Sequence, residues 1–446
     1  MWFMDSAVSP QLNNTRTIRA WCMYDWANSV YSLVITSAIF PVYYKAVAVT
    51  ERGDTVAFLG FSLNNSVLYT YALSFSFFIV ALILPLLSGM ADYAGRKKAY
   101  MKVFVALGSM ACMGLYFFRD VGDLEWAIFC SMLASIGYSG SLVFYDAFLP
   151  EIVTIDRYDA TSARGYSMGY YGSVILMVIC LFIITYFDSF GFATEGGAVR
   201  FTFLLVGLWW MGFSLITFRY VPENPYGRKA SGNIWTKGYA ELLKVWQSLK
   251  ASPDLKKYLA AFFFFNMGVQ TVMYLATLFG TDVLQMESSK LIMTILLIQL
   301  VASVGAWLSA RFSAANGNKV ALLGMIGIWV VVCIAAYFIS TENQFYALAF
   351  VVGMIMGGVQ SLARATYTKL IPENAIDHAS YFSFFDVAYN LSIVLGTFSF
   401  GLINQLTGNM RNSALVLALF FIVGMAMLAL VKSENLKKAN TAGASR

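Results

Sequence analysis

The chain has 446 residues, of which 59% are hydrophobic and only 12% are charged. A charged share so far below the roughly 25% of ordinary soluble domains excludes a soluble fold, because so much apolar surface has no interior large enough to bury it. The net charge of +6 is better explained by an uneven placement of Lys and Arg along a membrane chain than by nucleic acid, so no nucleic-acid partner is expected.

Apolar segments of about 20 residues, the length that crosses the hydrocarbon core of a bilayer, recur between short polar breaks. We therefore predict an all-α membrane protein with twelve transmembrane helices and with the lipid bilayer as its main partner. The predicted spans are residues 20–48, 67–91, 99–118, 124–149, 165–187, 199–219, 258–281, 288–310, 319–339, 343–368, 380–406 and 411–431.

The basic residues are distributed unevenly around these spans. An even number of spans places both termini on one side, and assigning that side to the cytoplasm leaves few of the 30 Lys and Arg residues outside. Those on the outer side are Lys45, Arg52, Arg119, Arg200, Lys290 and Arg411. This bias follows the positive-inside rule, so we expect both termini to be cytoplasmic.

The chain repeats part of its own pattern, which indicates two related halves. Two sets of residues recur at one constant offset, the first at a helix end and the second between the second and third helices of each half. They are Tyr145, Leu149, Pro150 and Glu151 with Tyr367, Ile371, Pro372 and Glu373, and Gly95 and Lys97 with Gly317 and Lys319. We predict six-helix halves at residues 1–218 and 258–446, the parallel repeat of carriers whose halves rock about a central site.

The longest polar break, residues 219–257, joins the two halves. Apolar residues recur there at helical spacing, opposite Lys237, Lys244 and Lys250. The apolar residues are Tyr239, Leu242, Leu243, Trp246 and Leu249. We predict an amphipathic helix that either lies in the lipid interface or packs on the protein's own cytoplasmic face.

The break after the second helix carries a turn motif, SGMADYAGRKK at residues 88–98. Gly95 permits a tight reversal, the bases Arg96 and Lys97 hold the turn in the cytoplasm, and Asp92 is expected to face a helix N-terminus or a neighbouring base. The motif resembles the major facilitator signature G-x-L-A-D-R-x-G-R-K, from which it departs at Ser88 and Tyr93.

The first helix narrows this resemblance. Residues 21–29 read WCMYDWANS, similar to the W-x-x-Y-D-W-A-N-S opening of the bacterial "unknown major facilitator" branch, which is related to the fungal autophagy-related vacuolar effluxers of amino acids. The resemblance implies a secondary transporter, a monomer in a bacterial inner membrane, that moves a small solute by alternating access. An amino acid or similar metabolite is one candidate solute, and the proton is one candidate coupling ion.

Four of the ionisable residues inside the predicted spans stand out, because a charge there is costly unless it faces the bundle interior or a partner. They are Asp25, Asp146, Arg364 and Asp386. Each lies within about two turns of the cytoplasmic end of its helix, so all four are expected in one layer. We predict that Arg364 bridges Asp146 and Asp386 as a cytoplasmic gate, and that Asp25 acts in gating or coupling; a structural hydrogen-bonding role is the alternative.

Polar residues accompany these charges and are predicted to contact the substrate or the coupling ion. They are Asn28 on the first helix, Asn266, Gln270 and Tyr274 as a stripe on the seventh, and Gln360 on the tenth. Glycines at 165, 169 and 172 predict a close helix contact on the fifth helix. Tyr138, Tyr166 and Tyr170 are interpreted as packing residues, and His378 as a solvated loop histidine.

Other classes of protein fit the sequence less well. The five cysteines are scattered through apolar runs, and no H-E-x-x-H or serine–histidine pair lies in the spans, so we predict no enzyme, no cofactor and no metal. A channel is disfavoured by the two-half repeat. A non-transporting membrane sensor with the same fold is the remaining alternative.

Overall fold

The structure is a computed structural model that describes residues 12–50, 53–228 and 230–432. The first span is an unbroken rod in which a π-helical stretch, η1 (Tyr31–Ala38), joins α1 (Thr15–Val30) to α2 (Ile39–Val47). The other long helices are α3 (Asn65–Ala94), α4 (Lys97–Gly114), α5 (Leu124–Asp146), α7 (Tyr158–Thr185), α8 (Glu195–Tyr220), α10 (Pro253–Asp282), α11 (Ser288–Asn316), α12 (Asn318–Phe338), α13 (Glu342–Leu370), α14 (His378–Thr407) and α15 (Met410–Ala429). The connector holds α9 (Ile234–Ala251), and the short helices are η2 (Leu115–Phe117), η3 (Val121–Asp123), α6 (Leu149–Ile152), η4 (Ile155–Arg157) and η5 (Phe187–Phe190).

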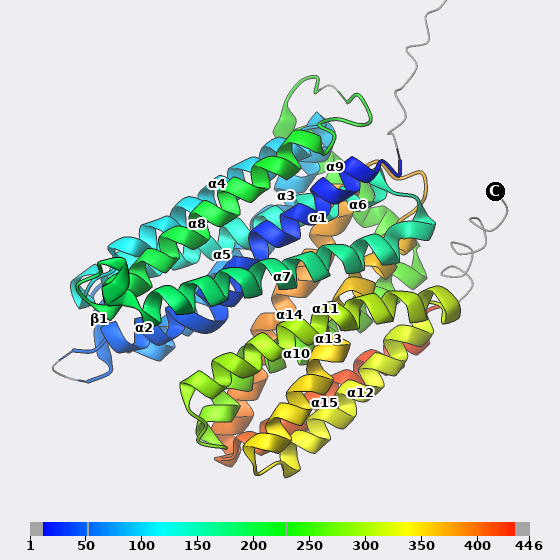
Figure 1. Cartoon of the computed structure of the whole chain (residues 1–446). Coiled ribbons are helices and arrows are strands. Elements are labelled where there is room, and N and C mark those ends of the chain that lie inside the picture. Colours follow the sequence, from blue (N-terminus) through cyan, green and yellow to red (C-terminus); the bar gives the residue numbers. More distant parts are fainter. Residues whose placement is uncertain (1–11, 51–52, 229, 433–446) are drawn as a thin grey trace, which may run out of the picture.

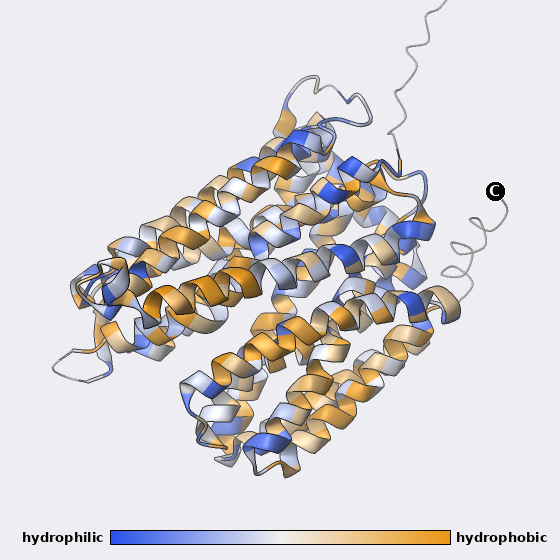
Figure 2. Ribbon diagram, viewed as in Figure 1, coloured by the Kyte–Doolittle hydropathy of each residue, from blue (hydrophilic) through white to orange (hydrophobic). Residues whose placement is uncertain are grey.

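The predicted twelve-helix membrane fold is confirmed. Within the described residues, 11 helices are long and apolar enough to cross a bilayer. The one remaining predicted span, 258–281, falls inside α10, which has 30 residues. Some helices are longer than predicted, because additional helical turns of polar residues continue the apolar segment. The helix predicted at 165–187 begins at Tyr158, and the one predicted at 288–310 ends at Asn316. Figure 2 shows this pattern, with apolar residues along the rods and hydrophilic ones gathered at their ends.

The long helices form two groups, α1 to α8 and α10 to α15 (Figure 1). In the first group α1 packs on α7 and α8, and α4 packs on α5 and α8; in the second, α11 packs on α13, and α15 packs on α10 and α12. The groups meet where α7 contacts α11 and α13 and where α14 contacts α3 and α5. In Figure 1 they converge toward the end with α6 and α9, the connector end, and diverge toward the opposite end.

The diverging end carries a short hairpin that was not predicted. Strand β1 (Thr55–Phe58) pairs antiparallel with β2 (Phe61–Asn64), with Thr55 opposite Asn64. The two turn residues, Leu59 and Gly60, both have positive φ, 47° and 84°, which suits the tight turn of a two-residue hairpin. This end is called the hairpin end below.

The connector helix α9 packs against α3 on one side. A Cβ atom on Gly89 would lie 2.3 Å from the carbonyl oxygen of Gly238, so the two backbones touch, and Val245 and Leu249 are also buried. Trp235 on a neighbouring side of α9 is exposed. One side of α9 therefore packs on the protein, as one of the two predicted alternatives requires. A neighbouring apolar side is exposed, as contact with the lipid interface requires.

Candidate transport site between the two helix groups

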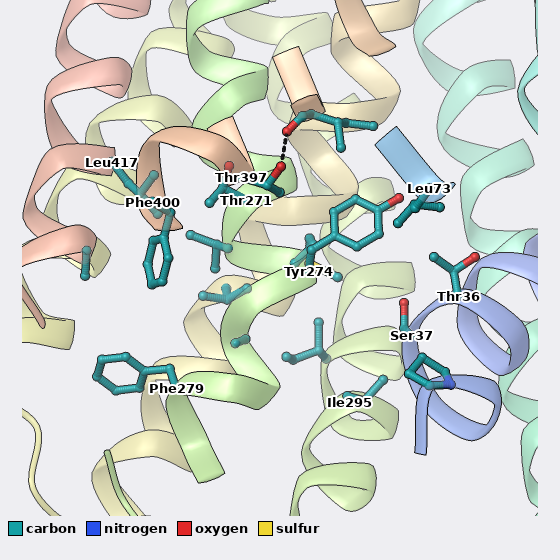
Figure 3. Close-up of a pocket in the computed structure, with 18 of the residues that line it drawn as sticks. Thr36, Ser37, Leu73, Thr271, Tyr274, Phe279, Ile295, Thr397, Phe400 and Leu417 are labelled. Atoms are coloured by element: carbon teal, nitrogen blue, oxygen red, sulfur yellow. Dashed lines mark hydrogen bonds between the residues drawn. The ribbon is translucent and has the colours of Figure 1, made fainter. Parts of the chain in front are cut away.

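A cavity of about 390 Å³ lies between the two groups in the half toward the hairpin end. Its lining is mainly apolar and comes from both groups, including Leu73 of α3 and Phe400 of α14. Figure 3 shows Tyr274 of α10 reaching across toward Leu73, with Thr36 and Ser37 of the π-helical stretch nearby. Single π-helical turns inside α-helices are frequent at functional sites, and here the π-helical stretch contributes Thr36 and Ser37 to the cavity wall.

A second cavity of about 140 Å³ continues from the first toward the connector end. The two share lining residues, which are Ser37, Met273, Tyr274 and Gln299. The deeper cavity is more polar, since Asp25, Asp146, Asp386 and Arg364 all contribute to its wall. An apolar outer cavity leading to a small polar pocket is the usual construction of a small-molecule binding site.

Arg364 forms the floor of this deeper cavity and joins the two helix groups. Its Nη1 donates to Oδ1 of Asp146 at 2.9 Å, and its Nη2 lies 3.4 Å from Oδ2 of Asp25. Its Nε donates to the hydroxyl of Ser162 at 2.9 Å. Only 2% of Arg364 is exposed, so this charge is compensated by partners from the other group rather than by water.

Aromatic rings and one glycine hold this ion cluster in place. The guanidinium lies over the rings of Trp21, at 4.8 Å, and Tyr166, at 4.5 Å, and the hydroxyl of Tyr145 donates to Oδ2 of Asp25 at 2.7 Å. A Cβ on Gly165 would lie 2.4 Å from that same oxygen. The glycines predicted to give α7 a close contact therefore do so against α1, and Gly165 leaves room for the carboxylate.

The predicted polar companions are only partly brought together. Those that line the deeper cavity are Asn28, Gln270, Tyr274 and Gln360. The amide nitrogen of Asn28 is buried behind this wall, with no hydrogen-bond partner within 3.5 Å among the described residues. Asn266 instead donates to Ser392 at 2.6 Å and contributes to neither cavity. The hydroxyl of Tyr170, a residue interpreted above as packing, donates to Gln360 at 2.7 Å.

Asp386 departs from its predicted partner. It lines the deeper cavity, as its depth indicated, but no ion pair joins it to Arg364 in the described part of the chain, where Arg364 pairs with Asp25 and Asp146. The depth of a residue in the membrane follows from its position along the helix, but it does not determine the direction in which its side chain points. The prediction that Arg364 bridges Asp386 is thus not met in this conformation.

A second ion cluster, absent from our predictions, closes the interface nearer the connector end. Lys369 of α13 donates to Oδ2 of Asp159 at 2.7 Å and to Asn318 at 2.9 Å. Asp159 lies at the start of α7, so the contact crosses between the groups, and it also accepts from Asn318 at 2.8 Å. Asp159 lies in the first turn of α7. The predicted span began at residue 165, so Asp159 was left outside the helix and was not considered.

The turn motif contributes a third contact across the interface. Asp92 accepts from the backbone N–H of Ser380 at 2.7 Å and of Ala379 at 3.3 Å, so it caps the N-terminus of α14, one of its two predicted roles. Gly95 has a φ of 64°, as a tight reversal requires. The side chain of Arg96 is exposed, whereas Lys97 is buried.

His378 is not a solvated loop residue, which corrects the prediction. It is the first residue of α14, only 5% exposed, and its Nδ1 lies 3.0 Å from Oε1 of Glu151. Glu151 also pairs with Lys97. The solvated interpretation failed because the start of α14 itself packs against other segments: Asp92 of α3 caps it, and the ring of Tyr226 in the connector lies 6.0 Å from that of His378.

The connector also forms ion pairs next to the start of α14. Arg228 and Lys244 both pair with Asp377, the residue before α14, and Arg228 also approaches Glu241 at 3.3 Å. Burial raises the pKa of Asp377, but the two cations outweigh this effect and hold it below its ordinary value. The carboxylate is therefore ionised at neutral pH, and its pairing would be lost only in strong acid.

These features define the class of protein: an α-helical membrane transporter of the major facilitator fold, with a central cavity between two six-helix groups. The solved structure of the proton:xylose symporter XylE, bound to 6-bromo-6-deoxy-D-glucose, has the same fold, with a TM-score of 0.71 at 13% identity over 96% of this chain and 98% of that one.

The chain belongs to the family described as vacuole effluxer Atg22 like, whose profile matches residues 13–160 and 154–441. It is similar to the uncharacterized MFS-type transporter YxiO of Bacillus subtilis, with 31% identity over 94% of this chain and 96% of that protein. It is also similar to the autophagy-related protein 22-1 of Aspergillus niger, with 23% identity over 89% of this chain and 78% of that protein. The expected family is thereby confirmed.

We expect Asp25→Asn to lower transport far more than it lowers the yield of folded protein. Asparagine keeps an acceptor for Tyr145 but removes the charge that meets Arg364. A hydrogen bond to a charged group contributes about 1.5–3 kcal/mol, so a loss of about tenfold or more is expected in the rate of solute exchange. Exchange in proteoliposomes and the size-exclusion profile measure the two effects, and unchanged exchange would reduce Asp25 to a structural residue.

Proposed function

We propose that this protein exports a small polar solute, such as an amino acid or a related metabolite, across a bacterial inner membrane by alternating access, acting as a monomer. Efflux is suggested by its family, whose description names a vacuole effluxer. The observation that carries the proposal is the polar pocket of α1, α5, α13 and α14 at the base of the larger cavity. It offers carboxylates and a guanidinium to a solute with charges of both signs.

The three clusters beneath this pocket form the gate in this proposal. Arg364, Lys369 and Asp92 each join residues from both helix groups on the connector side of the cavity. Breaking such buried pairs is costly unless new partners or water replace them. A solute that draws Asp25 or Asp146 away from Arg364 supplies those partners, so its binding favours opening at the connector end.

The orientation in the membrane is part of the proposal. We assign the connector end, and with it both termini, to the cytoplasm, because the predicted loops on that side carry most of the basic residues. A cysteine placed at Thr236, an exposed residue of α9, should react with a membrane-impermeant maleimide in inside-out vesicles and not in intact cells. Labelling in intact cells would reverse the orientation of the whole chain.

Counterflow in proteoliposomes tests the function. Vesicles loaded with unlabelled amino acids, diluted into a trace of the labelled mixture, should accumulate label transiently above equilibrium. Vesicles containing Arg364→Gln should show a much weaker overshoot. Saturable binding of the mixture without any counterflow would show a binding protein of the same fold rather than a transporter.

A further inference from the structure

We infer that Asp386 is the site at which a proton binds and leaves during each transport cycle, and that this carboxyl group couples the carrier to the proton gradient. The inference deepens the proposed function and rests on it, since it names the coupling ion and the residue that carries that ion.

Asp386 is a buried carboxyl group without a counter-charge. It is 7% exposed, and its Oδ2 accepts a hydrogen bond from the amide of Asn390 at 2.6 Å. The same amide donates to the backbone oxygen of Asp386 at 2.9 Å, which fixes the NH₂ group toward the carboxyl. Within residues 12–50, 53–228 and 230–432, no Lys, Arg or His forms an ion pair with it.

The other acids near the gate are compensated differently. Asp25 and Asp146 share Arg364, and Asp159 pairs with Lys369. Placing an isolated carboxylate in such an interior costs several kcal/mol, so a group of this kind is neutralised by a proton or a cation. Asp386 therefore needs a partner that the protein itself does not supply in this conformation.

The charge balance of the deeper cavity points the same way. The charged groups on its wall are Asp25, Asp146 and Asp386 against Arg364, three acids for one base, contributed by α1, α5, α14 and α13. The remaining titratable groups that face it are Tyr138, Tyr166, Tyr170, Tyr274 and Tyr389, from α5, α7, α10 and α14. These phenols carry no charge at neutral pH. One bound proton, or the cationic group of a solute, reduces the excess of negative charge.

A path for the proton is present on the hairpin side. The cavity that contains Asp386 shares Ser37 and Gln299 with the outer cavity, so in this proposal water in the two adjoining cavities brings the proton from the hairpin end to the carboxyl group. In the cycle, the carboxylate takes one proton from this water and later returns it to water at the connector end. No other bond forms or breaks.

The proton is separated from other cations by gradient experiments in proteoliposomes, with the labelled amino-acid mixture as the probe. In wild-type protein a pH gradient should drive accumulation of label, and a Na⁺ gradient at equal pH should not. With Asp386→Asn, gradient-driven accumulation should fall to the equilibration level, while counterflow falls much less. Asp188→Asn is the matched control, because Asp188 is exposed on η5 outside the cavity, and it should behave as wild type.

Infrared difference spectroscopy tests the same site without any solute. The purified, reconstituted protein should show the carbonyl band of a protonated, buried carboxyl group that disappears as the pH is raised. This band should be missing in Asp386→Asn and present in Asp188→Asn. An identical band in both variants would overturn the inference, as would Na⁺-driven accumulation or full proton coupling in Asp386→Asn. Absence of counterflow in wild type would instead refute the transport function, and the infrared result would still decide whether Asp386 binds a proton.

Discussion

Arg364→Gln should shift the protein strongly toward opening at the connector end. The substitution leaves Asp25 and Asp146 buried without their shared cation, and removing one partner of a buried ion pair costs about 3–5 kcal/mol. That free energy corresponds to more than about a hundredfold in the ratio of open to closed molecules. Ala163→Cys is a suitable reporter, since Ala163 is 3% exposed and packs against Ala306 between α7 and α11.

Double-mutant cycles separate the partners of Arg364. Combined with Asp146→Asn or Asp25→Asn, Arg364→Gln should show a coupling free energy within the range of about 0.5–3 kcal/mol seen for residues in contact. Combined with Asp386→Asn, it should be additive, because the two side chains form no ion pair in the described structure. Strict additivity with both Asp25 and Asp146 would show that Arg364 is not part of the gate.

Gly165→Val should disrupt the ion cluster of Arg364, Asp25 and Asp146 by filling the space that the Asp25 carboxylate occupies beside α7. The Cβ of the new residue would lie 2.4 Å from Oδ2 of Asp25 and 3.2 Å from Nη2 of Arg364, so the carboxylate must leave its position. Overpacking of this kind costs typically about 1–3 kcal/mol, and the broken pair adds to that cost. We expect loss of exchange activity and a lower midpoint of thermal unfolding.

Gly212→Val provides the matched control for this substitution. Gly212 lies in α8, and a Cβ there would meet nothing within 4 Å. The variant should keep both the activity and the unfolding midpoint of wild type. Equal losses in the two variants would mean that valine harms these helices in general and that the space beside Asp25 has no special role.

Composition and the length of the apolar segments were sufficient to predict the transmembrane helices, because a bilayer imposes a span length on each helix, and the two motif resemblances then indicated the fold. The offset between the halves placed Gly95 and Gly317 at equivalent turns, and both have positive φ. Depth along the helices placed Arg364 beside Asp146. The positions of the two turns depend only on distance along the chain, and the depth of Arg364 and Asp146 depends only on distance along the membrane normal.

The partners across the interface could not be predicted in this way. Lys369 was counted among the cytoplasmic bases, although it is 7% exposed and reaches Asp159 on the other group. Asp386 has the expected depth but faces Asn390 rather than Arg364. Which residues meet depends on the rotation and crossing of helices from different groups, and helical periodicity within one segment carries no information about either.

Reciprocal accessibility at the two ends is the most direct test of alternating access. Leu73→Cys reports on the outer cavity, and Ala163→Cys reports on the connector end. If the two groups rock about the central pocket, then Arg364→Gln should raise the fraction of molecules labelled at residue 163 and lower the fraction labelled at residue 73 by the same amount, because the two fractions sum to one. Labelling at residue 73 that stays constant while labelling at residue 163 rises would contradict the account, because the two ends would then open independently.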